Sequence, residues 1–456
     1  MAVRDASPEY GAKVEMPVVP EGYKQTEVGV VPDDWEVAPL GKAIAKLEAG
    51  VSVNSVDETQ RTYAHDQSVL KTSSIADGRF YPAECKKVAP RDLHRLSLNP
   101  EANTLLISRM NTPDLVGECG YVAQDHSSLF LPDRLWITRR RDDSEVDFHW
   151  LSYLLSSKPQ KSRIKGISTG TSGSMKNISK GSLLGLSIPF PAPREQRAIA
   201  TALSDVDALL EALDRLIAKK RDIKQATMQQ LLTAQTRLPG FEGEWDVRSL
   251  LEIADNQKSL FDDGDWVEAE HITDQGIRLV QTGNIGEGTF VEKATRKYIN
   301  EASFHKLKCK ELEEGDILIC RLAEPAGRAC ILPDIGESRV ITSVDVTIFR
   351  PRLEIADRGF LVQYFSTSDW FKKVLDNVGG TTHKRISRGA LGKLKVPFPP
   401  VEEQKAIAKV LTDMDADLEA LRERRTKTAA IKQALMQELL TGRTRLVEPE
   451  IRGRHA

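Results

Sequence analysis

The chain has 456 residues, of which 40% are apolar, and a formal net charge of −2. This length predicts two or three domains with sizeable cores, and the near-neutral charge argues against a stand-alone polyanion binder. No run of residues is apolar enough to cross a bilayer, and the first thirty residues lack the basic start and apolar core of a signal peptide. We therefore expect a cytoplasmic protein with no membrane partner. Its five cysteines form no C-x-x-C pair and its eight histidines are scattered, so neither disulfides nor a metal site is expected.

The first globular region follows an N-terminal extension. The extension covers residues 1–34, and the globular region spans 35–188. Short apolar or alternating runs bounded by Gly, Asn and Pro, such as the run at 105–109, predict strands joined by turns. The region is therefore expected to be mixed α and β, with a sheet order that the sequence does not predict.

A basic segment near the end of this region runs from Lys158 to Lys180 and contains no acidic residue. Its Gly- and Ser-rich loop offers hydroxyl and backbone N–H groups beside lysine, which suits the binding of phosphate oxygens; an ordinary solvated basic loop is the alternative. Arg109 follows an apolar strand and is a candidate to pair with guanine in a DNA groove, although a salt bridge inside the fold fits equally well. The candidates of this region are Lys71, Arg109, Thr169, Thr171, Ser172, Ser174 and Lys176.

The next segment, 189–241, is helical in character. From Arg194 to Leu238 there is no Gly or Pro, and apolar residues recur every three or four positions from Ile199 to Ile217, which is typical of a coiled-coil seam. We predict a helix of about 35 to 40 residues, roughly 55 to 60 Å long. Prolines precede it and Pro239 marks its stop.

The second half of the chain repeats this plan. A second globular region spans 242–396, a second helical segment spans 397–446 with Gly442 marking the stop, and a tail covers 447–456. The segment 397–446 matches 189–238 without a gap, and more than half of the paired positions are identical. The chain therefore has an internal pseudo-two-fold repeat and is expected to bind two similar partners or two half-sites.

The second globular region carries equivalent candidates. An apolar run at 317–320 precedes Arg321, and a short loop takes the place of the Gly- and Ser-rich one. One observation opposes nucleic-acid binding here, since residues 245–392 contain more acids than bases. The candidates are Arg321, Thr381, Thr382, His383, Lys384 and Arg385.

The repeat also preserves residues away from the helical seam, which a simple spacer would not require. We therefore predict that a partner docks on the outer face of the two helices, with a plain spacer as the alternative. The candidates for partner binding are Glu195, Gln196, Lys224, Gln225 and Gln229, with Glu403, Gln404, Lys432, Gln433 and Gln437 in the second copy.

The order of these features resembles that of the specificity (S) subunit of type I restriction-modification systems. The resemblance is carried by Ile178-Ser179, Pro189–Pro191, Glu195-Gln196 and Ile199, and again by Ile386-Ser387, Pro397–Pro399, Glu403-Gln404 and Ile407. It implies an α+β fold with two mixed α/β target recognition domains, separated by two long helices that form an antiparallel coiled coil. Each domain would read one half of a bipartite, asymmetric target in double-stranded DNA. The helices would set the gap between the half-sites and dock two methyltransferase (M) subunits.

The same resemblance implies that the chain is not an enzyme and holds no cofactor of its own. S-adenosylmethionine is expected in the M subunits, which would methylate adenine N6, and ATP and Mg in the restriction (R) subunits. The sequence agrees, because it contains neither an [D/N]-P-P-[Y/F] motif nor a G-x-x-x-x-G-K-[S/T] loop. Residues 166–170 match the G-x-S-x-G pattern of hydrolases, but a loop follows them where a helix is required. The alternative function is an adaptor or inhibitory paralogue that binds M subunits but not DNA.

Overall fold

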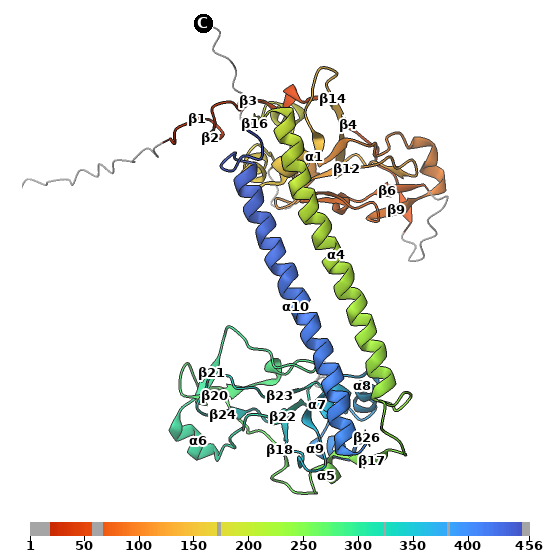
Figure 1. Cartoon of the computed structure of the whole chain (residues 1–456), viewed down its shortest axis with the longest axis vertical. Coiled ribbons are helices and arrows are strands. Elements are labelled where there is room, and N and C mark those ends of the chain that lie inside the picture. Colours follow the sequence, from red (N-terminus) through yellow and green to blue (C-terminus); the bar gives the residue numbers. More distant parts are fainter. Residues whose placement is uncertain (1–18, 57–66, 171–174, 323–324, 381–383, 449–456) are drawn as a thin grey trace, which may run out of the picture. The chain divides into compact units, whose positions relative to one another are not determined.

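The computed structural model describes residues 19–56, 67–170, 175–322, 325–380 and 384–448 (Figure 1). The chain divides into two compact units. Unit 1 combines residues 1–212 with 426–456, and unit 2 comprises 213–425. The two long helices, α4 (Pro193–Leu231) and α10 (Val401–Leu439), each contribute one part to unit 1 and one part to unit 2. The sequence had suggested that each helical segment is separate from the globular regions, whereas the structure divides both helices between the units.

Unit 1 is built on a six-stranded mixed sheet. Its order is β4-β14-β10-β12-β8-β7, and all neighbours are antiparallel except β12 and β8. The central strand β10 is fully buried and confirms the strand predicted near 105–109. The bounds are β4 (Ile44–Ala49), β7 (Ile75–Ala76), β8 (Gly78–Phe80), β10 (Thr104–Ser108), β12 (Cys119–Val122) and β14 (Leu135–Arg140).

Smaller sheets and three short helices complete unit 1. Helix α1 packs on β12 and β8 and is buried along nearly its whole length. The smaller sheets are β13 (Leu129–Phe130), β6 (Ser68–Leu70), β9 (Cys85–Val88) and β5 (Ser55–Val56) in that order, and the pairs β1 (Tyr23–Thr26) with β2 (Gly29–Pro32), β3 (Glu36–Pro39) with β16 (Ser187–Phe190), and β11 (Met110–Asn111) with β15 (Lys176–Asn177). The helices are α1 (Phe148–Ser156), α2 (Lys158–Gly166) and α3 (Lys180–Leu184).

Unit 2 contains two four-stranded sheets and one two-stranded pair. The first sheet has the order β18 (Phe261–Asp263), β25 (Val346–Phe349), β22 (Ile317–Cys320), β23 (Ala329–Ile331), and the second has the order β19 (Ile272–Thr273), β21 (Lys297–Ile299), β20 (Ile277–Val280), β24 (Val340–Thr342). The pair is β17 (Asp246–Ser249) with β26 (Lys395–Phe398). The helices are α5 (Leu250–Ile253), α6 (Glu301–Leu307), α7 (Arg358–Tyr364), α8 (Ser368–Leu375) and α9 (Arg388–Lys393). Each unit is therefore mixed α and β, as predicted.

The long helices supply part of the core of each unit. In unit 1 the last turn of α10, through Met436 and Leu439, and Leu440 directly after it join the same buried cluster as Ile199 and Leu203 of α4. In unit 2 the last turn of α4, through Met228 and Leu231, and Leu232 directly after it join the cluster that contains Ile407 and Leu411 of α10. The apolar seam predicted from the sequence is thus buried. Burial of this stripe stabilises helices that would be marginal in isolation.

Both long helices are 39 residues long, as expected, but α4 stops earlier than Pro239 suggested. The chain leaves α4 through Ala234 and leaves α10 through Gly442, with φ of 58° and 71°. This left-handed backbone turns the chain away from the helix axis. Neither helix, nor any other in the described part of the chain, has an apolar stretch of the length needed to span a bilayer.

Candidate nucleic-acid interface and helix junctions

The candidates of the first globular region lie on different parts of unit 1. Nζ of Lys71 is 3.5 Å from Glu84. The guanidinium of Arg109 lies over the ring of Trp136, 6.0 Å from its centroid, and its buried Nε has no hydrogen-bond partner among the described residues. Thr169 forms a β-bridge with Asn177, while Lys176 donates to the carbonyl oxygen of Gly170 at 2.9 Å. Thr171, Ser172 and Ser174 lie outside the described residues.

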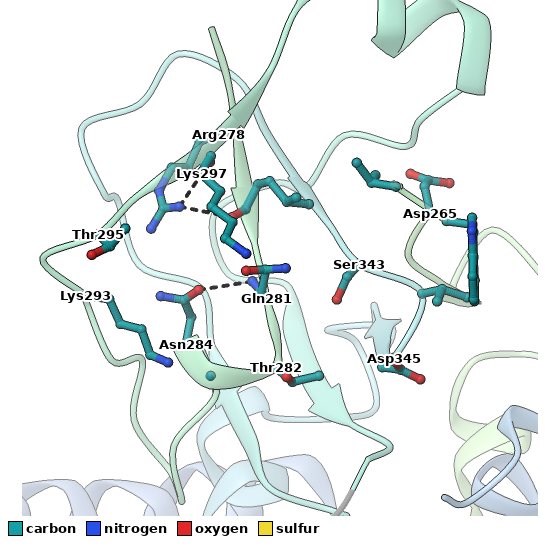
Figure 2. A pocket seen from close by; sticks show the side chains of 15 residues that line it. Asp265, Arg278, Gln281, Thr282, Asn284, Lys293, Thr295, Lys297, Ser343 and Asp345 are labelled. Atoms are coloured by element: carbon teal, nitrogen blue, oxygen red, sulfur yellow. Dashed lines mark hydrogen bonds between the residues drawn. The ribbon is translucent and has the colours of Figure 1, made fainter. Parts of the chain in front are cut away.

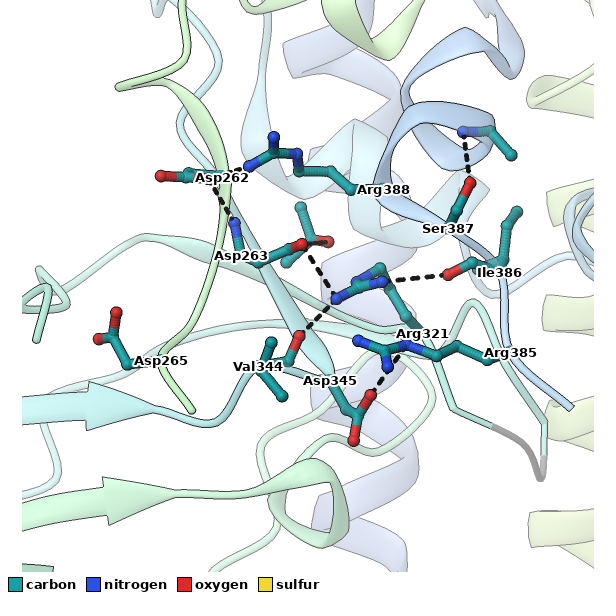
Figure 3. Close-up of polar contacts among 12 residues, drawn as sticks. Asp262, Asp263, Asp265, Arg321, Val344, Asp345, Arg385, Ile386, Ser387 and Arg388 are labelled. Carbon is teal, nitrogen blue, oxygen red and sulfur yellow. Dashed lines mark hydrogen bonds and ion pairs between the residues drawn. The ribbon is translucent and has the colours of Figure 1, made fainter. Parts of the chain in front are cut away.

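Arg321 of the second globular region is buried inside a polar network (Figure 3). Its side chain forms an ion pair with Asp263 at 3.0 Å and donates to the carbonyl oxygens of Ile386, at 3.2 Å, and Val344. Burial lowers the pKa of Arg321, against the opposing effect of Asp263. Only 3% of the residue is exposed, so the salt bridge that we considered as the alternative to base pairing is present. Contact between Arg321 and guanine stays a prediction.

The neighbouring arginines are paired in the same network. Arg385 forms an ion pair with Asp345 at 3.0 Å, and its backbone forms β-bridges with Gly379 and Leu322. Arg388 is bonded to Asp262. Lys384 is exposed and forms no ion pair with the residues that the structure describes, whereas Thr381, Thr382 and His383 lie outside them. Arginine side chains in and beside the predicted phosphate-binding loop are therefore already paired with carboxylates of the same unit.

Glu195 lies at the centre of a contact that joins both long helices to the first globular region. Its carboxylate accepts from Nε1 of Trp35 at 3.0 Å and from Arg445 at 2.5 and 2.8 Å. Arg445 follows α10 and also binds Asp34 at 2.8 and 2.9 Å, which holds the pKa of Asp34 below its usual value. We call the set Trp35, Glu195 and Arg445 junction 1.

The same three residue types meet in unit 2. Glu403 accepts from Nε1 of Trp245 at 3.0 Å and from Arg237 at 2.5 and 2.6 Å. Arg237 follows α4, as Arg445 follows α10, and Glu403 lies in the first turn of α10. We call the set Trp245, Glu403 and Arg237 junction 2. Each junction thus ties a globular region to the beginning of one long helix and the end of the other.

The glutamines that follow these glutamates are buried as well. Gln196 accepts from the backbone N–H of Asp147 at 2.9 Å, and Gln404 accepts from that of Asp357 at 2.8 Å. Each also donates to a proline carbonyl, of Pro191 and Pro399 respectively. We had expected the four Glu and Gln side chains on an outer face. This placement was wrong, because all four are buried and form the hydrogen bonds within the protein that buried polar groups require. Their conservation in the repeat has a structural reason, and partner binding by them stays a prediction.

A second pair of equivalent contacts lies further along the helices. Lys432 binds Asp207 at 2.8 Å, and Tyr153 donates to the same carboxylate at 2.8 Å. In unit 2, Lys224 binds Asp415 at 2.5 Å, and Gln363 donates to that carboxylate at 2.9 Å. Both lysines were predicted to bind a partner, yet each holds one long helix against the other within its unit.

The remaining partner-binding candidates are exposed. They are Gln225 and Gln229 on α4, and Gln433 and Gln437 on α10. The last two line an open cavity of about 540 Å³ in unit 1, together with Val30, Leu154 and Met436.

Comparison with known proteins agrees with this architecture. The family model described as the type I restriction modification DNA specificity domain matches residues 93–220 and 242–430. The chain belongs to this family. It is 26% identical over 441 residues to the type I restriction enzyme MjaVIII specificity subunit of Methanocaldococcus jannaschii, covering 93% of this chain and 96% of that protein.

Solved structures show the same fold. The type I restriction-modification system S subunit from M. genitalium superposes with a TM-score of 0.53 at 18% identity, covering 89% of this chain and 96% of the other. A chain from a structure concerned with complex assembly and conformational transition of the type I R-M system has a TM-score of 0.53 at 16% identity, covering 91% and 99%.

Sequence reasoning missed the tryptophan and arginine members of the two junctions. Both signals were present in the sequence, since Trp35 parallels Trp245 at the start of each globular region and Arg237 parallels Arg445 in the repeated helical segments. Long-range partners such as Trp35 and Glu195, 160 positions apart, do not follow from a helical period. The parallel positions could have marked these residues as equivalent, but only the structure supplies their contacts.

Proposed function

We propose that this chain is the DNA sequence-recognition and scaffold subunit of a type I restriction-modification complex. Each globular region would read one half of a bipartite, asymmetric DNA target. The observation that carries this proposal is the duplicated junction, in which each globular region is fixed to both long helices by a buried Glu, an Arg and a Trp. Two recognition modules held on one scaffold suit two half-sites.

The long helices would form an antiparallel coiled coil that sets the gap between the half-sites. Ion pairs within unit 2 support this arrangement, because the paired residues follow opposite orders along α4 and α10. Asp214 pairs with Arg425 at 3.0 Å, Lys220 with Asp417 at 3.0 Å, and Lys224 with Asp415 at 2.5 Å. The numbers rise on one helix as they fall on the other.

The chemistry would reside in partner subunits. Two M subunits with S-adenosylmethionine would methylate adenine N6, and R subunits with ATP and Mg would carry out restriction. The exposed Gln225, Gln229, Gln433 and Gln437 are our candidates for the M-subunit surface. Their equivalent positions on two helices fit two copies of one partner.

The test is a methylome. This chain would be co-expressed with its cognate M subunit in a bacterial host that lacks DNA methylation, with the M subunit alone as control. We expect a single bipartite motif with N6-methyladenine that is absent from the control. A complex of the two proteins that methylates nothing would favour an inhibitory adaptor, and failure to form a complex would contradict the scaffold proposal.

A further inference from the structure

A polar hollow of about 420 Å³ lies in the second globular region, on the sheet formed by β19, β21, β20 and β24 (Figure 2). The side chains of Lys293, Thr295 and Lys297 lie on one side of it, and those of Asp265, Ser343 and Asp345 lie on the other. Sequence reasoning named none of these residues. All of them belong to unit 2.

The two lysines differ from the basic residues that the sequence had singled out. Arg321 and Arg385 are held by Asp263 and Asp345. Neither Lys293 nor Lys297 forms an ion pair with any residue that the structure describes, although acids outnumber bases in this region. These two ammonium groups are therefore available to a ligand.

The side-chain amide of Gln281, which also lines the hollow, is fixed in place. Gln281 and Asn284 exchange hydrogen bonds at the two ends of a short 3₁₀ turn, with the backbone N–H of Gln281 donating to Asn284 at 3.0 Å. Asn284 also donates to the carbonyl oxygen of Val291 at 2.9 Å. The NH₂ group of Gln281 has no partner among the described residues. A rigid donor with no internal partner suits recognition of a hydrogen-bond acceptor.

Trp266 adds an apolar surface to the same hollow. It is 64% exposed, whereas Trp35, Trp136, Trp150 and Trp370 are buried and Trp245 is half-buried. Exposing a large aromatic ring to water is unfavourable unless a partner covers it. Its place at the hollow indicates that the ligand has an apolar part beside its polar groups.

We propose that Trp266, Gln281, Lys293 and Lys297 form the site through which the second globular region reads the base edges of its DNA half-site. This inference rests on the function proposed above and assigns it to residues. Lysine and glutamine donors match the N7 and O6 acceptors of purines, and an apolar side chain matches the thymine methyl group.

The charges favour base edges over the phosphate backbone. Asp265 and Asp345 face the lysines across the hollow. They pair with Lys310 at 3.5 Å and Arg385 at 3.0 Å, which fixes carboxylate oxygens that can still accept hydrogen bonds from the amino group of cytosine but offer nothing to phosphate oxygens, which are acceptors themselves. The polar lining also argues against an apolar small molecule, because pockets for such ligands are lined mainly by hydrophobic side chains.

The experiment uses the full chain with its M subunit in the methylation-free host. The variants are Trp266→Ala and the double variant Lys293→Ala/Lys297→Ala, with Lys293→Gln as a milder change. The control is Lys258→Ala/Lys306→Ala, which removes two exposed lysines of the same unit outside the hollow. The readout is the methylated fraction at every genomic variant of the motif.

We expect discrimination at one or two base positions to fall by roughly 5- to 150-fold, the range for losing one good base contact, in one half-site only. The control should keep the unaltered motif. An unchanged motif in the hollow variants would overturn the proposal, and so would an even loss of methylation with the same base preferences, which indicates phosphate contacts. If the unaltered chain itself directs no methylation, the proposed function fails and the inference fails with it.

Discussion

Junctions 1 and 2 use the same three residue types but differ in how their members are brought together. In junction 2, Arg237 and Trp245 are joined by a short loop, whose carbonyl oxygens at Glu242 and Gly243 also accept from the arginine. In junction 1, the arginine and the tryptophan lie near opposite ends of the chain. Arg445 there has a second carboxylate partner, Asp34, 411 positions away.

The difference shows what a short loop contributes. A loop holds its ends at high effective concentration, whereas distant segments lose more entropy when they meet. In junction 1 the extra ion pair with Asp34 offsets this loss, as does the hydrogen bond from Tyr23 to the carbonyl oxygen of Gly442 at 2.8 Å. The described part of the N-terminal extension therefore contributes to the stability of unit 1.

The largest effect is expected from removing the central glutamates. Glu403→Ala should cause the largest loss in the free energy of unfolding, because the fully buried Glu403 carboxylate accepts hydrogen bonds from both Arg237 and Trp245. Glu195→Ala should cost less, because Arg445 keeps Asp34. Denaturant unfolding with hydrogen exchange in each unit would measure both. Glu402→Ala, next to Glu403 but exposed, is the matched control and should change little. Equal losses of stability in Glu403→Ala and Glu195→Ala would contradict the comparison.

Stability should fall when a methyl group is added in the turn after α10 and rise when one is removed in the turn after α4. Gly442→Ala should destabilise unit 1 by about 1–3 kcal/mol, because a Cβ atom there would lie 2.4 Å from Pro32 and 3.0 Å from Trp35. Ala234→Gly should stabilise unit 2 by up to about 1 kcal/mol, since glycine adopts a positive φ without strain. Thermal unfolding of both variants measures this. A loss of stability in Ala234→Gly would show that the turn is not strained.

The smallest effect is a response of unit 1 to mild acid. His149 stacks on Tyr121, with ring centroids 4.5 Å apart, and burial lowers its pKa; burial also lowers the pKa of His126. As the pH falls through the unfolded value of about 6.5, the unfolded chain takes up more protons than the folded one, so stability falls. In unit 2 the equivalent position is Gly359, since it is the second residue after the N-cap Asp357 of α7, as His149 is after the N-cap Asp147 of α1. Hydrogen exchange at about pH 7.5 and pH 5.5 should show loosening in unit 1 that His126→Gln/His149→Gln removes.

The repeat, the two long helices and the strands β10 and β22 were predictable because each depends on local pattern. The sheet orders were not, since strands of two to six residues pair with segments far away in the sequence. The helical period also misplaced Glu195 and Glu403. A buried carboxylate that is satisfied by distant Trp and Arg side chains looks, in sequence, like a residue on a solvated face.

The candidate DNA-binding residues were harder to predict than the fold. Positive residues after strands or in loops drew attention to Arg321 and Arg385, but the sequence gives no sign of Asp263 and Asp345 beside them. Lys293 and Lys297 were overlooked because their surroundings in sequence are unremarkable. Whether a basic side chain is available to a ligand depends on which acids the fold brings near it.

The discontinuity of unit 1 has a consequence for synthesis on the ribosome. Unit 2 is one continuous stretch, residues 213–425, so every contact within it is available once that stretch has emerged. Unit 1 requires Met436, Leu439 and Arg445, which are made after the whole of unit 2. Until they appear, the apolar surface at Ile199 and Leu203 lacks its cover. Most of unit 1 is thus translated before unit 2 but completed after it, the reverse of the usual order in which the more N-terminal domain folds first.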